Sequence, residues 1–322
     1  MNMVIGLSLI ILFTFGVPIA ISIILASIIG IEFFTRLPLL LVPQQMFIGI
    51  DKFPLMAIPF FILAGNLMAA GGISQRLVDL AKSIVGRVQG GLAMSCVLTC
   101  MMFAAVSGSS VATTFAIGAI LIPAMVKHGY PKPLAASIQA SSAELGVLIP
   151  PSIPLILYGV STDTSIGQLF LAGIGPGILI GCALIIFLYI FCKIRGYGKD
   201  DYKDSTGFMI SVKRAWVAML MPVVVIGGIY GGIFTPTEAS AVAVFFALIV
   251  GGFYYRELKM ADMWPIFRQS VISTAAVMLI IAAASLFSFL LSRTGLPAHI
   301  ATLVTNTIDN PMMFLLVVNA LL

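Results

Sequence analysis

Charged residues are scarce in this sequence. Asp, Glu, Lys and Arg together make up 9% of its 322 residues, whereas soluble domains carry about a quarter. Hydrophobic residues make up 60%, and no soluble core could absorb that much apolar surface. A membrane-spanning helix needs about 20 apolar residues. Apolar runs of that length recur along the chain, which predicts about eight to ten membrane-embedded segments.

Motifs of enzymes and of nucleic-acid binding are also missing. The sequence contains no HExxH, no paired Asp motif for metal and phosphate, and no Ser/His/carboxylate set, which argues against a membrane enzyme. No Lys/Arg cluster is interleaved with aromatic residues, so the net charge of +5 indicates basic loops at an anionic membrane face. We therefore predict no catalytic residues, no organic cofactor and no nucleic-acid partner.

One polar segment, from Lys193 to Arg214, separates two apolar halves. Basic residues crowd both of its ends. Because short basic loops stay on the cytoplasmic side of a membrane, we place a linker over residues 196–214 in the cytoplasm. The linker separates a first repeat over residues 1–195 from a second over residues 215–322.

Two short Gly/Pro signals recur in the two halves at similar offsets. Pro18 and Pro236 lie in one pair of matching segments, and Gly72 and Gly295 lie in the other. Weak internal repeats, often of inverted topology, are typical of secondary transporters. Coincidence between two short signals is the alternative. Under the repeat interpretation, the second half stops before any counterpart of Ser107 to Gly159, so we expect the sequence to be incomplete.

A cluster of small hydroxyl residues interrupts one apolar stretch. Ser107, Ser109 and Ser110 surround Gly108, and Thr113 follows. Backbone at membrane depth can leave the helix only where protein or an aqueous cavity satisfies its amides. Glycine supplies the conformational freedom, and the hydroxyls supply oxygen ligands without a fixed charge. We interpret the cluster as the tip of a re-entrant hairpin, and close helix packing through small residues is the alternative.

Three prolines, at positions 150, 151 and 154, break a second apolar stretch. Each removes an amide donor and frees a carbonyl upstream, so we predict that Gly146 to Pro151 is unwound. Carbonyl and hydroxyl oxygens suit a dehydrated sodium ion, and the amino terminus of a half-helix suits a carboxylate. Glu144 lies near this stretch and is a functional candidate because burying a carboxylate in a membrane is costly. Helix capping is its alternative role.

A second acidic residue has a clearer structural role. Glu238 follows Thr235 by three positions, and Pro236 stands directly after the threonine. This spacing is that of a capping box with proline at the first helical position. We predict that Glu238 begins a helix and does not bind a ligand.

With the two interrupted stretches and two further segments, the sequence resembles, over essentially its whole length, the large membrane subunit of tripartite ATP-independent periplasmic (TRAP) transporters. The matching segments are IPFFILAGNLMAAGGIS, VSGSSVATTFAIGAILIPAM, GVLIPPSIPLILYGVSTDTSIGQLFLAGIGPG and GIFTPTEASAVAV. The resemblance implies an all-α integral membrane fold, a polytopic helical transporter with re-entrant hairpins, broken helices and inverted repeats.

The resemblance also implies a function. It implies sodium-coupled import of a small organic acid, either a carboxylate or an acidic sugar, by an elevator mechanism in the bacterial inner membrane. The implied partners are the lipid bilayer, a small membrane subunit and a periplasmic substrate-binding protein. A self-sufficient ion-coupled carboxylate carrier, which needs no binding protein, is the alternative.

Carried over by position, the resemblance places the coupling sodium ion and the substrate on the two interrupted stretches. The implied sodium ligands are hydroxyl and carbonyl oxygens of Ser107, Ser109, Ser110, Gly146, Ile149 and Pro151. The residues implied to face the substrate are Ser107, Gly108, Thr113, Glu144, Pro150 and Ser152.

Overall fold

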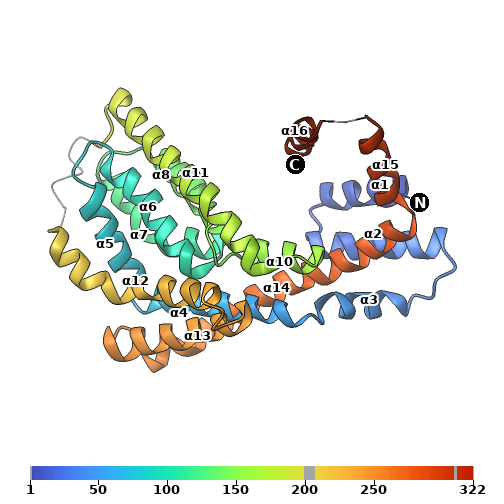
Figure 1. The fold of residues 1–322 in the computed structure, drawn as a ribbon, viewed down its shortest axis with the longest axis horizontal. Helices are drawn as coiled ribbons and strands as arrows, with labels where there is room; N and C mark the ends of the chain where they lie inside the picture. The colour runs from blue at the N-terminus through green and yellow to red at the C-terminus, as the bar shows by residue number, and fades with distance from the viewer. Residues whose placement is uncertain (1, 199–206, 308–309, 322) are drawn as a thin grey trace. The chain divides into compact units, whose positions relative to one another are not determined.

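The computed structural model describes residues 2–198, 207–307 and 310–321, and its regular structure over these residues is entirely helical (Figure 1). Seven helical segments among them are long and apolar enough to cross a membrane, and four shorter apolar helices accompany them. The all-α, multi-pass membrane fold expected from the sequence is therefore confirmed. Residues 199–206 of the predicted cytoplasmic linker lie outside the described residues.

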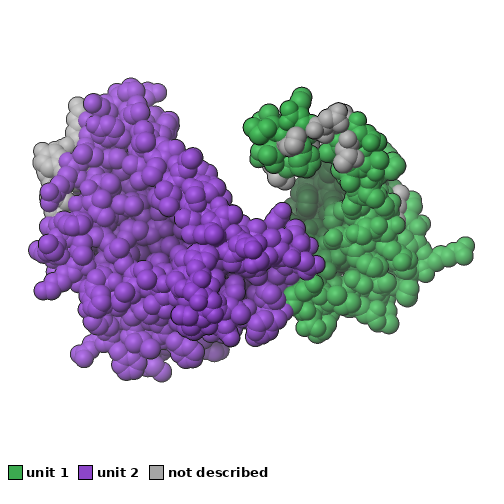
Figure 2. Space-filling model, viewed as in Figure 1, with its two compact units in different colours: residues 1–52, 275–322 green, residues 53–274 purple. Residues whose placement is uncertain are grey.

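The chain forms two compact units, which are coloured separately in Figure 2. One unit combines residues 1–52 with residues 275–322, and the other contains residues 53–274. Their boundaries differ from those of the predicted repeats. The division into repeats at residues 195 and 215 stays a prediction. Residues 208–214, which we had placed in the linker, already belong to a helix that begins at Phe208.

The first unit is built from apolar helices at both ends of the sequence. Its helices are α1 (Asn2–Thr14), α2 (Ile19–Phe34), α3 (Leu41–Ile50), the later part of α14 (Met260–Arg293), α15 (Leu296–Thr307) and α16 (Pro311–Leu321). Gly30 of α2 lets that helix approach Ile5 of α1, because a Cβ at Gly30 would lie 2.6 Å from the Ile5 side chain. A small core joins α2, α3 and α14 through Ile31, Val42, Leu286 and Leu290.

The second unit contains both interrupted stretches. Its elements are the short 3₁₀ helix η1 (Phe53–Met56), α4 (Ala57–Ala70), α5 (Ile73–Val85), α6 (Gly91–Ser107), α7 (Ser110–Lys127), α8 (Lys132–Ala143), α9 (Leu145–Leu148), α10 (Ile153–Thr162), α11 (Ile166–Arg195), α12 (Phe208–Tyr230), α13 (Pro236–Leu248), the π-helix η3 (Ile249–Tyr254) and the start of α14. Helix α6 lies at its centre and packs against α5, α7, α8, α9 and α11. Most α6 side chains are buried, which explains its almost uniformly apolar sequence.

The predicted capping box at the start of α13 is confirmed. The Glu238 carboxylate accepts the Thr235 backbone N–H at 2.8 Å, and the Thr235 hydroxyl accepts the Glu238 N–H at 3.3 Å. Pro236 occupies the first turn, where its missing N–H leaves no intrahelical hydrogen bond unmade. Glu238 thus has the structural role that its spacing predicts.

Candidate functional site

Helices α6 and α7 form a hairpin whose turn consists of Gly108 and Ser109. Gly108 ends α6 with φ of 62°, a left-handed conformation that suits glycine, and its N–H donates to the Ala104 carbonyl at 3.1 Å. Ser109 is extended, and its hydroxyl accepts the Ala112 N–H at 3.3 Å, which caps α7. The break expected at the serine cluster is confirmed, and its depth in the membrane stays a prediction.

The second interrupted stretch is unwound over fewer residues than we predicted. Helix α9 closes one turn over Leu145–Leu148, so Gly146 is helical, and the chain is non-helical only from Ile149 to Ser152. A proline removes only its own N–H donor. Because Ile149 precedes both prolines, its N–H can still donate to the Leu145 carbonyl, at 2.9 Å, and this bond closes the turn. The Gly146 carbonyl loses its helical donor because Pro150 has no N–H.

Serine caps the helix that resumes after the break. The Ser152 hydroxyl accepts the Leu155 N–H at 3.4 Å and donates to the Val147 carbonyl. Pro151 has no N–H to offer that carbonyl, so the serine side chain replaces the missing backbone donor. Ser152 therefore bridges the broken helix from α9 to α10.

The hairpin turn and the broken helix lie in direct contact. The Gly108 carbonyl accepts the Ile153 N–H at 3.1 Å, and a Cβ at Gly108 would lie 2.4 Å from the Pro151 oxygen. A Cβ at Gly146 would lie 3.1 Å from the Ser109 carbonyl carbon. The predicted meeting of the two stretches is therefore confirmed, and glycine at both positions permits it.

Four helix ends converge at this contact. Helices α7 and α10 begin there with their amino termini, and α6 and α9 end there with their carbonyl groups. Amino termini of helices attract anions, and carbonyl ends attract cations. The helix ends at the junction are therefore electrostatically suited to a cation and an anionic group without a charged side chain.

The residues expected at the site differ in burial. Those that are buried in the junction are Ser107, Gly108, Thr113, Gly146, Pro150, Pro151 and Ser152. Those that are half-buried are Ser109, Ser110 and Ile149. Glu144 is exposed at the end of α8, so the structure does not place its carboxylate in the buried contact.

A buried polar network behind the hairpin turn escaped the sequence reasoning. Gln139 of α8 is 1% exposed, its amide nitrogen donates to the Thr113 carbonyl at 3.3 Å, and its oxygen accepts the Cys96 thiol at 3.0 Å. The Thr113 hydroxyl donates to the Ser109 carbonyl at 2.8 Å and lies 3.3 Å from the Ser107 hydroxyl. Gln139 thus connects α8 to both arms of the hairpin.

One signal in the sequence could have identified this network. Gln139 is the only amide side chain in the segment Lys132–Ala143, whose other polar residues are a lysine and three serines. A primary amide that is buried in an apolar environment needs hydrogen-bond partners. Gln139 therefore indicated a contact with another helix, although the sequence could not say which helix supplies the partners.

The junction contains hard oxygen ligands. Hydroxyl and carbonyl oxygens favour cations such as sodium over the transition metals that prefer imidazole or thiolate. Within the described parts of the chain, no three His, Cys, Asp or Glu side chains come together as a metal-binding group. A cation at the junction would therefore be held by neutral oxygens.

Comparison with known proteins gives a consistent family match. Residues 7–322 match the model of the family described as "Tripartite ATP-independent periplasmic transporter, DctM component". The isethionate TRAP transporter permease protein DctMQ of Oleidesulfovibrio alaskensis is 44% identical over 309 residues, which cover 95% of this chain and 48% of the relative. The C4-dicarboxylate TRAP transporter large permease protein DctM of Pseudomonas aeruginosa is 42% identical over 278 residues, which cover 86% and 65%.

A further relative extends the range of named substrates. The sialic acid TRAP transporter large permease protein SiaM of Vibrio cholerae is 38% identical over 307 residues, which cover 95% of this chain and 72% of the relative. The chain thus spans 48% to 72% of the length of these three relatives.

Proposed function

Because this chain belongs to the DctM family of tripartite ATP-independent periplasmic transporters, we propose that it is the large membrane subunit of a sodium-coupled importer for a small organic acid. The observation that carries the proposal is the contact between the hairpin turn and the broken helix, where Gly108 meets Pro151. Two helix amino termini and two carbonyl ends meet at the same place, an arrangement that suits symport of an anion with a cation.

The sodium ion is placed at the carbonyl ends of α6 and α9. Its proposed ligands are oxygens of Ser107, Ser109, Ser110, Gly146, Ile149 and Pro151. The Gly146 carbonyl supports this placement because Pro150 removes its helical donor. Ser107 supports it because its hydroxyl is fully buried and lies beside the Thr113 hydroxyl.

The substrate is proposed to be a carboxylate or an acidic sugar. Relatives are named for C4-dicarboxylates, sialic acid and 2,3-diketo-L-gulonate, all of which are organic acids. The amino terminus of α7, with Thr113 in its first turn, would receive the acidic group, and Ser152 lies beside it at the start of α10, whose first N–H groups are bonded within the protein. The exposed position of Glu144 gives no support to its role beside the substrate.

The partners follow from the family description. A tripartite transporter has two further components, which we propose are a small membrane subunit and a periplasmic binding protein. We place the complex in the bacterial inner membrane and propose an elevator mechanism, for which the two compact units offer a mobile and a static part. A self-sufficient carrier would instead transport substrate without an added binding protein.

Replacing Ser107 with alanine tests the sodium site. The change removes one hydroxyl oxygen and little volume, and one lost oxygen contact should raise the sodium concentration for half-maximal uptake by about fivefold. Uptake would be measured against sodium concentration in proteoliposomes that contain the complete transporter and its binding protein. Ser161→Ala is the matched control because the exposed Ser161 hydroxyl bonds only a carbonyl of its own helix, at 2.8 Å.

Two results would contradict this assignment. A Ser107→Ala variant with normal sodium dependence but weaker affinity for the organic acid would show that the hydroxyl contacts substrate. An equal sodium response in Ser107→Ala and Ser161→Ala would show that the Ser107 hydroxyl is not a sodium ligand.

Replacing Glu144 with glutamine should leave sodium-dependent uptake within about twofold of the unmodified protein. Neutral oxygens suffice to hold sodium, and Glu144 is exposed at the end of α8. Initial rates with and without a sodium gradient provide the measurement. A collapse of uptake, with sodium binding retained, would instead assign the carboxylate an essential role in coupling.

A further inference from the structure

A pocket of about 490 Å³ lies on the second unit, away from the hairpin turn. Side chains of α5 and α12 and of the segment that follows α13 line it, and charged and aromatic groups dominate among them. None of these side chains has a part in the proposed transport site. Its chemistry therefore points to a different ligand.

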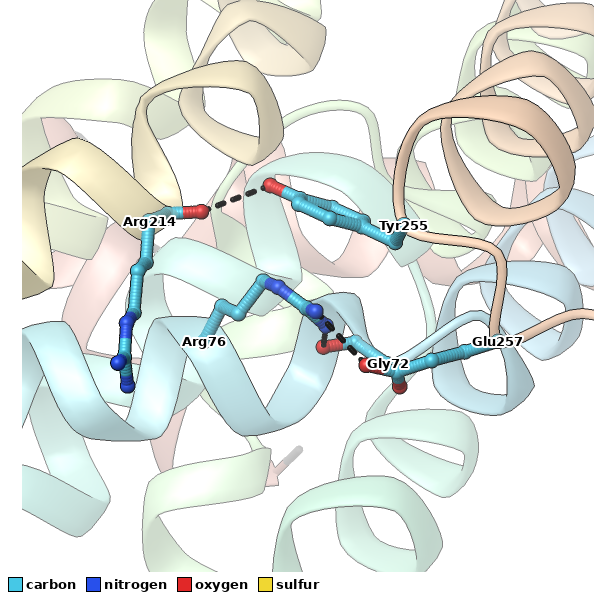
Figure 3. Close-up of polar contacts among 5 residues, drawn as sticks. All are labelled: Gly72, Arg76, Arg214, Tyr255 and Glu257. Carbon is cyan, nitrogen blue, oxygen red and sulfur yellow. Dashed lines mark hydrogen bonds and ion pairs between the residues drawn. The ribbon is translucent and has the colours of Figure 1, made fainter.

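One wall of the pocket is held rigidly by Arg76. Its guanidinium forms an ion pair with Glu257 at 2.7 Å, donates to the Gly72 carbonyl at 2.8 Å and stacks 3.7 Å from the centre of the Tyr255 ring (Figure 3). Gly72 has φ of 73°, and a Cβ there would lie 1.6 Å from the Glu257 carboxylate. The charge of Arg76 is thus balanced by Glu257, and both side chains are fixed in place.

The opposite wall carries two cations that lack such a partner. Lys213 and Arg214 of α12 line the pocket, and neither forms an ion pair with a carboxylate in the part of the chain that the structure describes. Asp79, the other acid of the lining, accepts a hydrogen bond from Gln75 at 3.1 Å. The lining thus carries three cations and two carboxylates, an excess of one positive charge, and Lys213 and Arg214 are its cations without an ion-pair partner among the described residues.

The tyrosines connect the two walls at the boundary of the membrane. The Tyr255 hydroxyl donates to the Arg214 carbonyl at 3.0 Å (Figure 3). The Tyr254 and Tyr255 rings meet edge to face at 5.0 Å. Arg214 lies near the start of the candidate span 208–230, and the tyrosines lie at the end of the span 236–254. Tyrosine and basic side chains at the ends of spans are typical of the level of lipid head groups.

We propose that this pocket binds the phosphate of an anionic phospholipid, with Lys213 and Arg214 as its ligands. The basic residues of the sequence predict that this end of α12 lies on the cytoplasmic side, where the membrane surface is anionic. Arginine and lysine are the usual partners of phosphate, and the tyrosines would pack beside the glycerol backbone. The proposal is independent of the transported substrate, and it assigns to the second unit a lipid contact that holds α12 against α5.

Lipid binding can be measured on the complete purified protein in detergent. The thermal unfolding midpoint is followed while phosphatidylglycerol, phosphatidylcholine or inorganic phosphate is added. We expect phosphatidylglycerol to raise the midpoint and phosphatidylcholine to leave it unchanged, because the choline cation of the latter balances its phosphate and leaves the lipid without a net charge. Lys213→Gln and Arg214→Gln should each weaken the apparent affinity for phosphatidylglycerol by about fivefold.

Lys259→Gln is the matched control. Lys259 is an exposed cation of the loop that follows η3, but it does not line the pocket, so its removal should leave the affinity unchanged. The proposal is overturned if the Lys213 and Arg214 variants respond to phosphatidylglycerol as the unmodified protein does. It is also overturned if inorganic phosphate alone raises the midpoint to the same extent, because the site would then take a free anion.

Discussion

Gly108→Ala is expected to reduce sodium-driven uptake by at least about a hundredfold. The added Cβ would lie 2.4 Å from the Pro151 carbonyl oxygen, so the hairpin turn and the broken helix must move apart. Because the Ile153 N–H bonds the Gly108 carbonyl at 3.1 Å, this movement also strains the start of α10. A misplacement of about 1 Å between reacting or binding groups can cost about a hundredfold in rate.

The matched control for this variant is Gly129→Ala. Gly129 also has a positive φ, 86°, but a Cβ there would meet nothing within 4 Å. Both alanines carry the cost of a left-handed conformation, about 1–2 kcal/mol, and only the one at Gly108 meets the broken helix. Initial uptake rates in proteoliposomes, with the unfolding midpoint of each variant, separate the two effects. Equal uptake in both variants would show that the junction tolerates separation and is not the binding site.

Gln139→Leu is expected to lower both stability and sodium affinity, with an effect of about ten- to a hundredfold on uptake at low sodium. Leucine has a similar volume but leaves the Cys96 thiol without its acceptor and removes the donor to the Thr113 carbonyl. An unsatisfied buried polar group costs about 1–3 kcal/mol. Thr113 contacts Ser107 and Ser109, so the loss should reach the proposed ligands through the hairpin arms.

Gln89→Leu provides the comparison for this variant. The Gln89 amide donates to the carbonyls of Cys192 and Tyr197 at 3.2 Å, before α6 begins and away from the hairpin turn. The same substitution there should lower the unfolding midpoint and leave the sodium concentration for half-maximal uptake unchanged. If Gln139→Leu likewise lowers the unfolding midpoint but leaves the sodium concentration for half-maximal uptake unchanged, Gln139 has a structural role and does not position the sodium ligands.

The two stretches of the site could be found in the sequence because each breaks a local rule. A glycine among serines interrupts one apolar stretch, and this position is the α6–α7 turn of the structure. Consecutive prolines interrupt the other stretch, and this position is the break between α9 and α10. The extent of unwinding could not be predicted from the prolines alone. It depends on whether the donor just before them, the Ile149 N–H, closes one more turn, and in the structure it does.

Neither the role of Gln139 nor the pocket lined by Arg76 could be predicted from local sequence, because both depend on residues that are far apart along the chain. A buried amide signals that a partner exists, but the partners of Gln139 lie on α6 and α7. The ion pair of Arg76 with Glu257 likewise joins residues that are far apart in the sequence. Glu144 shows the reverse case, because its place in an apolar stretch suggested burial and the structure leaves it exposed.

The sequence by itself determined that the chain is a multi-pass helical membrane protein, where its helices break, and how α13 is capped. These properties depend on composition and on residues within a few positions of one another, such as Thr235 and Glu238. Only the tertiary structure decided which residues touch where the two stretches meet, Gly108 and Pro151, that Gln139 connects α8 to the hairpin, and that Lys213 and Arg214 line one pocket with Arg76. Such contacts depend on how helices pack, and the apolar faces of membrane helices are too alike for a single sequence to specify their partners.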